Sequence, residues 1–198
     1  MLFRSEDIER VRAIRHTLGD DFLIVCDANQ AWTVEEALRF ADGVREYNLA
    51  WLEEPVRWHN ATEAMAQVRR HTGIPVAAGQ GENHRWGCWG LVEGGAVDIL
   101  NVDAAIAGGV TEWRRIAQAA SVKGIRMAHH EEPHLSVHLL TSIPHGLYVE
   151  VFEPERDPVY WRLNNQLPEI SDGFIHAPNA PGFGLDLNRE LIEKYKVL

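Results

Sequence analysis

Three oxygen-bearing side chains stand at the ends of three successive apolar runs of the sequence. Asp27 follows the run FLIVC, Glu53 lies near the end of LAWLEEP, and Gln80 follows IPVAAG, with Glu82 just beyond. Their spacing agrees with the roughly 25–30 residues of one βα unit in a barrel. Oxygen ligands with no cysteine among them suit Mg²⁺ rather than zinc. We therefore predict a Mg²⁺ site where parallel strands end, although Asp27 taken alone is better explained as the cap of the next helix.

Groups suited to proton transfer stand at the ends of the later apolar runs. Asp103 ends VDILNVD, His129 and His130 end IRMAHH, and Glu150 lies inside YVEVF. His, Asp and Glu are the usual side chains of general acid–base catalysis. Because every expected strand ends in a group with usable chemistry, the sequence predicts a site with a metal side and an acid–base side.

The elements that must position these groups alternate between strands and helices. Helices are predicted at 5–18, with Ser5 as N-cap and Gly19 as its end, and then at 34–47 behind Thr33, 62–71, 85–93, 110–120, 135–141 and 189–195. Strands are predicted at 22–27, 49–55, 74–79, 97–103, 125–129 and 148–152. This alternation is typical of a parallel α/β sheet that right-handed crossovers curl toward a barrel. Six strands are two fewer than a closed eight-stranded barrel needs.

Composition narrows the class of protein. The chain has 198 residues, 45% of them apolar and 24% charged, as expected of one globular domain with a substantial core. The net charge of −10 argues against nucleic acid as a partner, but a bound divalent ion would still let the protein take an acidic substrate. Cys26 and Cys88 are predicted to be buried, reduced thiols of a cytoplasmic protein. No segment is predicted to span a membrane or to act as a signal peptide.

Six motifs occur in an order and spacing that resemble one family. They are DANQAW at 27–32, LEEPV at 52–56, AAGQGENHRWG at 77–87, ILNVDAAIAGGVTEW at 99–113, RMAHHEEPHLSVHLL at 126–140 and VEVFEP at 149–154. Together they resemble the mandelate racemase and muconate lactonizing enzyme family of the enolase superfamily, over nearly the whole chain. The resemblance implies a TIM-like (β/α)7β barrel that binds Mg²⁺ and a carboxylate substrate. It also implies that residues 1–198 form a partial C-terminal barrel domain.

The resemblance assigns the metal ligands to particular positions. The family's first two ligands match Asp27 and Glu53. The third, usually Glu or Asp, matches Gln80, which can coordinate through its amide oxygen but supplies no charge. Position favours Gln80, and Glu82 is close enough to replace it.

The resemblance also assigns the acid–base and substrate groups. The family's His–Asp dyad matches His130 and Asp103, in which the Asp orients the imidazole and raises its basicity. Glu150 matches a residue that hydrogen-bonds the developing enolate in racemases, and Asn29 matches a polar residue near the metal and the substrate. Arg85 is a further candidate for contacting substrate. His129 would point away from the dyad because neighbouring strand residues face opposite sides, and we favour a structural role for it.

Three functions follow from this resemblance as alternatives. The first is Mg²⁺-dependent dehydration of a sugar acid to a 2-keto-3-deoxy acid, suggested by the many polar residues near the expected pocket. The second is a racemase or epimerase of a 2-hydroxy acid, which normally needs a second base. The third is a truncated, non-catalytic chain, because the family's Lys-x-Lys strand and N-terminal capping domain have no counterpart in this sequence. We expect a homo-oligomer for a full-length form.

Overall fold

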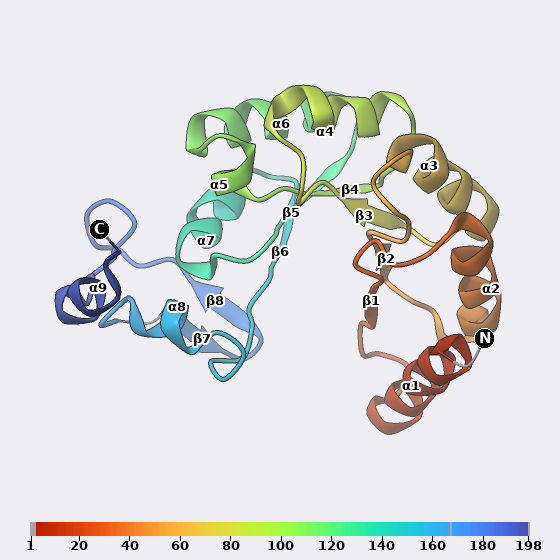
Figure 1. Ribbon diagram of the computed structural model, residues 1–198, viewed down its shortest axis with the longest axis horizontal. Coiled ribbons are helices and arrows are strands. Elements are labelled where there is room, and N and C mark those ends of the chain that lie inside the picture. Colours follow the sequence, from red (N-terminus) through yellow and green to blue (C-terminus); the bar gives the residue numbers. More distant parts are fainter. Residues whose placement is uncertain (1–2, 167, 198) are drawn as a thin grey trace.

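Six short parallel strands form the centre of the molecule. The computed structural model describes residues 3–166 and 168–197. The strands are hydrogen-bonded in chain order, from β1 at one edge to β6 at the other. They are β1 (Val25–Asp27), β2 (Trp51–Glu53), β3 (Val76–Ala78), β4 (Ile99–Asn101), β5 (Arg126–His129) and β6 (Gly146–Val149). Figure 1 shows a curled sheet that stays open between β1 and β6. This arrangement confirms the predicted six-stranded, incomplete α/β barrel.

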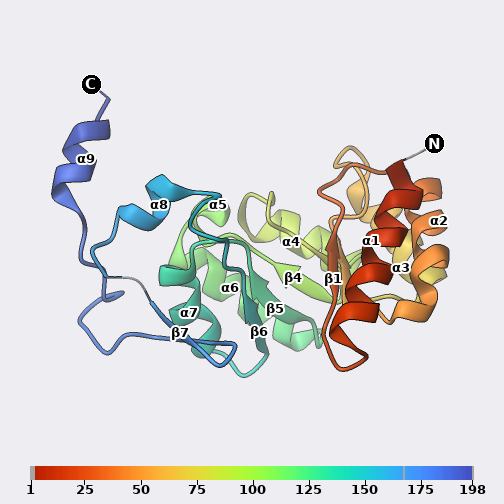
Figure 2. The ribbon, with the colours of Figure 1, turned by 90° about the horizontal axis from the view of Figure 1, so that it is seen from below.

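Helices cover the convex side of this sheet (Figures 1 and 2). They are α1 (Phe3–Leu18), α2 (Val34–Val44), α3 (Ala61–Thr72), α4 (His84–Glu93), α5 (Ala104–Ala107), α6 (Val110–Val122) and α7 (Pro133–Thr141). The remaining elements form a C-terminal extension beside α7: α8 (Pro158–Arg162), an antiparallel hairpin of β7 (Glu169–Ser171) and β8 (Phe174–His176), and α9 (Arg189–Tyr195). None of the helices in the described part of the chain has the length and apolar character needed to cross a bilayer.

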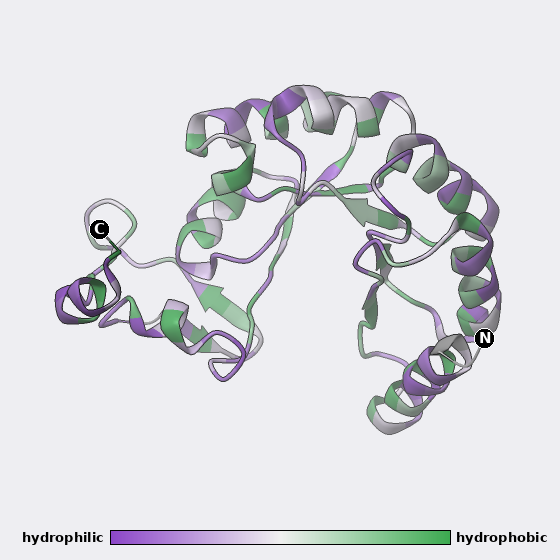
Figure 3. Cartoon of the chain, in the orientation of Figure 1, coloured by the Kyte–Doolittle hydropathy of each residue, from purple (hydrophilic) through white to green (hydrophobic). Residues whose placement is uncertain are grey.

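The main core lies between the sheet and these helices. Strand side chains such as Leu52 and Leu100 pack with helix side chains such as Phe40, Met65 and Ile116, all of them almost fully buried. Burying an aliphatic or aromatic side chain of this size stabilises a fold by roughly 1.5–3 kcal/mol. Figure 3 accordingly shows mainly hydrophobic colour on the strands and hydrophilic colour on outer sides of the helices.

Local sequence signals explain several element boundaries. Thr33 accepts a hydrogen bond from the Glu36 amide, and the Glu36 side chain binds back to the Thr33 amide, so a complete capping box begins α2. Gly73 ends α3 in the left-handed conformation, with φ of 70°, as predicted. The predicted helix 34–47 is wrong at its end: α2 stops at Val44, and a 3₁₀ turn (Arg45–Tyr47) follows.

Other predicted boundaries are also corrected. Helix α1 begins at Phe3, so Ser5 lies inside it and is not the N-cap. Strand β1 begins at Val25, and Phe22 and Leu23 are 50% and 59% exposed because β1 is an edge strand with one neighbour. The helix α5 and the elements α8, β7 and β8 were not predicted, because each is too short to show a periodic apolar pattern.

The last strand differs from its prediction in a way that matters for the site. Strand β6 spans Gly146–Val149, so Glu150 lies one residue beyond it and not inside it. Met127 of β5 pairs with Gly146, whereas His129 pairs with Val149, which indicates a bulge in β6. Two residues of β6, Leu147 and Tyr148, therefore lie opposite a single residue of β5.

Candidate active site

The predicted site residues gather at the carboxyl ends of the six strands. Asp27 and Glu53 end β1 and β2 and are direct register partners. Gln80 and Asp103 follow β3 and β4 by two residues, while His130 and Glu150 each follow β5 and β6 directly. Parallel strands that end at one edge bring these groups together, which is where α/β barrels carry their sites.

The metal side brings carboxylates close enough to affect one another's charge. Burial raises the pKa of Glu53 to about 7, hydrogen bonds from Trp51 and Asn101 oppose this rise, and the charges of Asp27 and Glu150 add to it. Burial also raises the pKa of Glu150, to which nearby Glu131 and Asp27 contribute. Carboxylates that repel one another in this way form an environment that a divalent cation would stabilise.

Gln80 and Glu82 occupy different surroundings. The amide oxygen of Gln80 is buried and has no hydrogen-bond partner. The carboxylate of Glu82 lies directly over Gly87 of α4, and its charge raises the pKa values of Glu54 and Cys88. The unpaired amide oxygen fits a hard cation, whereas Glu82 is directed toward the helix layer. Asp27, Glu53 and Gln80 thus offer oxygen donors of the kind that Mg²⁺ prefers, although no three His, Cys, Asp or Glu side chains of the described residues converge on one metal position.

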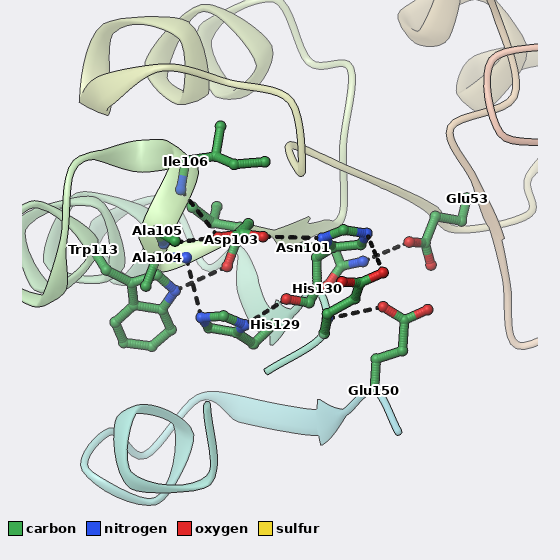
Figure 4. A network of polar contacts seen from close by, with 12 residues as sticks. Glu53, Asn101, Asp103, Ala104, Ala105, Ile106, Trp113, His129, His130 and Glu150 are labelled. Carbon is green, nitrogen blue, oxygen red and sulfur yellow. Dashed lines mark hydrogen bonds and ion pairs between the residues drawn. The ribbon is translucent and has the colours of Figure 1, made fainter. Parts of the chain in front are cut away.

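On the acid–base side, His130 and Asp103 form a direct contact (Figure 4). His130 Nδ1 lies 3.2 Å from Asp103 Oδ2. The other oxygen, Oδ1, accepts hydrogen bonds from the Ala105 and Ile106 amides and so caps α5. Burial alone would lower the pKa of His130, but Asp103 and the charges of Glu150 and Glu131 outweigh it and raise that pKa. The pKa of Asp103 is lowered, because hydrogen bonds from His130 and these amides outweigh its burial.

A strained turn places Glu150 beside the dyad. Glu131 and Glu132, which follow His130, both have positive φ angles, of 54° and 50°. Two successive non-glycine residues in this region are costly, at about 1–2 kcal/mol each. The turn directs the Glu131 amide at Glu150 Oε2, 2.9 Å away, and so fixes that carboxylate near His130.

His129 points to the opposite side of β5. It is 0% exposed, its Nε2 accepts a hydrogen bond from the Ala104 amide, and its Nδ1 contacts the His130 carbonyl oxygen. Its ring lies 6.1 Å from that of Trp113 in the core. His129 thus stabilises the β4–α5 connection, in agreement with the expected structural role.

Two predicted substrate-binding residues have partners within the protein. The amide and side chain of Asn29 donate hydrogen bonds to the two carboxylate oxygens of Asp27, so Asn29 orients that carboxylate. Arg85 forms a paired contact with Glu112 of α6, at 2.7 and 3.0 Å. Since its guanidinium group joins two outer helices, the structure does not bring Arg85 to the site.

Sequence reasoning overlooked residues that hold Glu53. Asn101 Nδ2 donates to Glu53 Oε1, and Trp51 Nε1 donates to Glu53 Oε2 at a distance of 3.2 Å (Figure 4 shows Asn101). Glu54 is 98% buried in the helix layer, where its carboxylate accepts from the Gly79 amide. Asn101 had a detectable signal, because it is a polar residue inside an apolar strand, two positions before Asp103.

The arrangement combines a place for a cation with an oriented base. The Asp103 contact occupies His130 Nδ1, while Nε2 lies 3.8 Å from Glu131 Oε1, too far for a hydrogen bond. A substrate carboxylate attracted to the metal side would therefore lie near that nitrogen. Removal of a proton next to the carboxylate is the chemistry that such a pairing supports.

Comparisons with known proteins agree with this geometry. The family described as enolase C-terminal domain-like matches residues 3–191. The chain is 31% identical to a 3,6-anhydro-alpha-L-galactonate cycloisomerase of Streptomyces coelicolor, over 98% of this chain and 52% of that protein. It is 32% identical to an L-talarate/galactarate dehydratase of Salmonella typhimurium, over 94% of this chain and 45% of that protein. The chain thus spans about half the length of the curated relatives it matches.

Solved structures show the same likeness. A mandelate racemase/muconate lactonizing enzyme from a marine actinobacterium, in complex with magnesium, superposes with a TM-score of 0.92 at 42% identity, over 98% of this chain and 55% of that one. An L-talarate dehydratase from a Polaromonas species, complexed with Mg and L-glucarate, gives 0.88 at 33% identity, over 98% and 52%. The magnesium in these structures agrees with the metal predicted from the oxygen ligands.

Proposed function

The chain belongs to the enolase C-terminal domain-like family, within the mandelate racemase and muconate lactonizing group, and from this membership we propose that it serves Mg²⁺-dependent dehydration of a sugar acid. The product would be a 2-keto-3-deoxy acid. The observation that carries the proposal is the oriented His130–Asp103 pair at the same sheet edge as Asp27, Glu53 and Gln80. Sugar-acid dehydratases among the relatives support the substrate class.

In this proposal each side of the site has its own task. Asp27, Glu53 and Gln80 would hold Mg²⁺, which would supply positive charge to stabilise the negative charge that develops on the substrate carboxylate. His130 accepts the alpha proton at Nε2, since Asp103 keeps the Nδ1 proton in place. The imidazolium then returns a proton to the departing 3-hydroxyl, which leaves as water. Glu150, which the Glu131 amide holds at 2.9 Å, lies on the acid–base side and is the group that the family resemblance pairs with the charge developing on the substrate.

A second reaction shares the first step. Cycloisomerases occur among the relatives, and a racemase from Streptomyces coelicolor with bound magnesium is a structural neighbour at 29% identity. Such reactions begin with loss of the same proton and differ in what receives it afterwards. Among the described residues, Lys123, Lys194 and Lys196 lie in outer helices or beyond them, and both reactions would use His130 for the first proton transfer.

Metal binding gives the first test. Asp27→Ala and Glu53→Ala should abolish Mg²⁺ binding in calorimetry, because each removes a charged ligand from a site with few. Asp42→Ala, on the exposed face of α2, is the matched control and should bind as the parent does. Gln80→Ala should weaken binding more than Glu82→Ala. If Glu82→Ala is the more damaging change, Glu82 is the third ligand and Gln80 is not.

Proton removal gives the second test. The full chain is incubated with Mg²⁺ and a panel of aldonic and aldaric acids in D₂O, while NMR follows deuterium entering at the alpha carbon and a colorimetric assay follows 2-keto-3-deoxy acid. We expect both signals, at a weak but measurable level, from the parent and from His71→Asn, an exposed control on α3. His130→Asn should reduce both by about 10²–10⁴-fold. Exchange without keto-acid product would favour the racemase or epimerase alternative, and no exchange with any acid would contradict the proposal.

A further inference from the structure

Two aromatic rings meet across the interior of the curled sheet. The ring of Trp51, on β2, stacks on that of Tyr148, on β6, with centroids 5.5 Å apart and planes inclined by 27°. These strands are not neighbours in the sheet, because β3, β4 and β5 lie between them. The contact therefore joins the two limbs of the open curl directly.

Small side chains in the interior of the curl leave space for this contact. A small interior cluster beneath the site consists of Ala77, Ile99 and Ala128. Trp51 and Leu147 pack against this cluster. The two alanines leave space for an indole to reach across. The bulge in β6 places Leu147 and Tyr148 together opposite Ala128, which brings the Tyr148 ring to this side of the sheet.

Each ring lies two residues before a site carboxylate. Residues two apart in a strand share a face, so Trp51 lies on the same face of β2 as Glu53. Tyr148 lies in β6, and Glu150 directly follows that strand. Trp51 is also bonded to the carboxylate above it, since its Nε1 donates to Glu53 Oε2 at 3.2 Å. Asn101 donates to the other oxygen, Oε1, so both oxygens of Glu53 are held.

We propose that Trp51 and Tyr148 form an aromatic bridge that positions the site. Through its N–H group, Trp51 orients Glu53. Through the stack, the bridge fixes the separation between β2, which carries the metal side, and β6, which carries Glu150. Both are positioning residues, as neither ring is placed against the substrate. The inference rests on the proposed function only in taking Glu53 as a Mg²⁺ ligand.

Metal affinity tests the positioning role in the full chain. Trp51→Phe keeps a ring but loses the N–H donor, and Tyr148→Leu loses the stack but keeps that donor. We expect each to weaken Mg²⁺ binding by about 10-fold in calorimetry, within the roughly 10–100-fold range of residues that orient metal ligands. Tyr148→Phe should restore most of the affinity lost in Tyr148→Leu. Trp89→Phe, a half-buried indole between α4 and α6, is the control and should bind like the parent.

These variants distinguish a failure of the positioning inference from a failure of the proposed metal site. If the parent binds Mg²⁺, Glu53→Ala does not, and Trp51→Phe and Tyr148→Leu match the parent, the positioning inference is overturned while the proposed metal site stands. If the parent binds no Mg²⁺, the proposed site fails, and a metal-free measurement decides the bridge. Urea unfolding of Trp51→Leu, Tyr148→Leu and the double variant should then be non-additive, with the double variant losing less than the sum. Strict additivity would show that the rings do not act together.

Discussion

At the residue scale, the site depends on how each carboxylate is held. Asp103 has one oxygen on His130 and the other on two amides of α5, so its position is set by a helix start as well as by its partner. Glu53 is held by two neutral donors, Trp51 and Asn101, and carries a pKa near 7. The carboxylate of Asp103 is therefore stabilised as an anion. Burial disfavours the anion of Glu53, which a nearby positive charge would stabilise.

The His130–Asp103 pair predicts a defined dependence of stability on pH. The pKa of His130 in the folded protein lies above its ordinary value of 6.5, so the imidazolium stabilises the fold fully below that value. This stabilisation is lost as the pH rises through the folded-state pKa. Asp103→Asn keeps an oxygen for the α5 amides but loses the charge. We expect the parent's advantage in unfolding free energy over this variant to be larger at pH 5.5 than at pH 9, measured in urea.

NMR titration of the imidazole supplies the companion measurement. The pKa of His130 should be lower in Asp103→Asn than in the parent. A His130 pKa that does not move, together with a stability difference independent of pH, would mean that Asp103 acts only as a helix cap.

At the element scale, short strands place chemistry and long helices supply stability. Each strand of the sheet has three or four residues, so it contributes few buried side chains of its own. The helices bury the larger apolar groups, among them Trp113, Phe40 and Met65. The residues that cap the helix N-termini therefore influence the stability of the sheet and the helices packed on it.

The capping box of α2 offers a measurable case. Thr33→Ala removes the side-chain acceptor for the Glu36 amide and should reduce the free energy of unfolding by about 1 kcal/mol, within a range of roughly 0.5–2 kcal/mol. Chemical denaturation followed by circular dichroism measures the loss. The control is Thr111→Ala, an exposed position in α6, which should change stability by less than about 0.5 kcal/mol. Equal losses of unfolding free energy in Thr33→Ala and Thr111→Ala would show that the capping box adds no stability of its own.

At the scale of the whole molecule, the open curl leaves two strand edges without neighbours among the described residues. The outer edges of β1 and β6 pair with no other strand, and exposed apolar residues flank these strands, including Leu23 before β1 and Val151 after β6. An uncovered edge with apolar neighbours is a template for association with another chain. An open barrel also admits water to the site, which weakens its electrostatic interactions.

We expect the 198-residue chain, expressed alone, to self-associate and to turn over sugar acids weakly. Leu23→Lys places a charge beside the β1 edge and should shift sedimentation velocity profiles toward the monomer at the same protein concentration. Val122→Lys is the matched control, because Val122 is 81% exposed at the far end of α6. A parent chain that sediments as a monomer with ordinary turnover would contradict this expectation.

The sequence by itself determined the order of elements, the parallel sheet and the positions of the chemistry. Apolar runs that end in Asp27, Glu53, Asp103 and His130 carry that information locally, because a strand end and its polar residue are adjacent in the chain. Thr33 and Gly73 mark helix boundaries for the same reason, since caps depend on residues only a few positions apart.

Only the tertiary structure decided which side chains meet. The pairing of Arg85 with Glu112, the two donors on Glu53, and the Trp51–Tyr148 stack join segments far apart in the sequence or depend on register. The bulge that turns Tyr148 inward follows from how β6 fits beside β5. The sequence favours Gln80 over Glu82 by position alone, and only the folded chain distinguishes an unpaired amide oxygen from a carboxylate packed on α4.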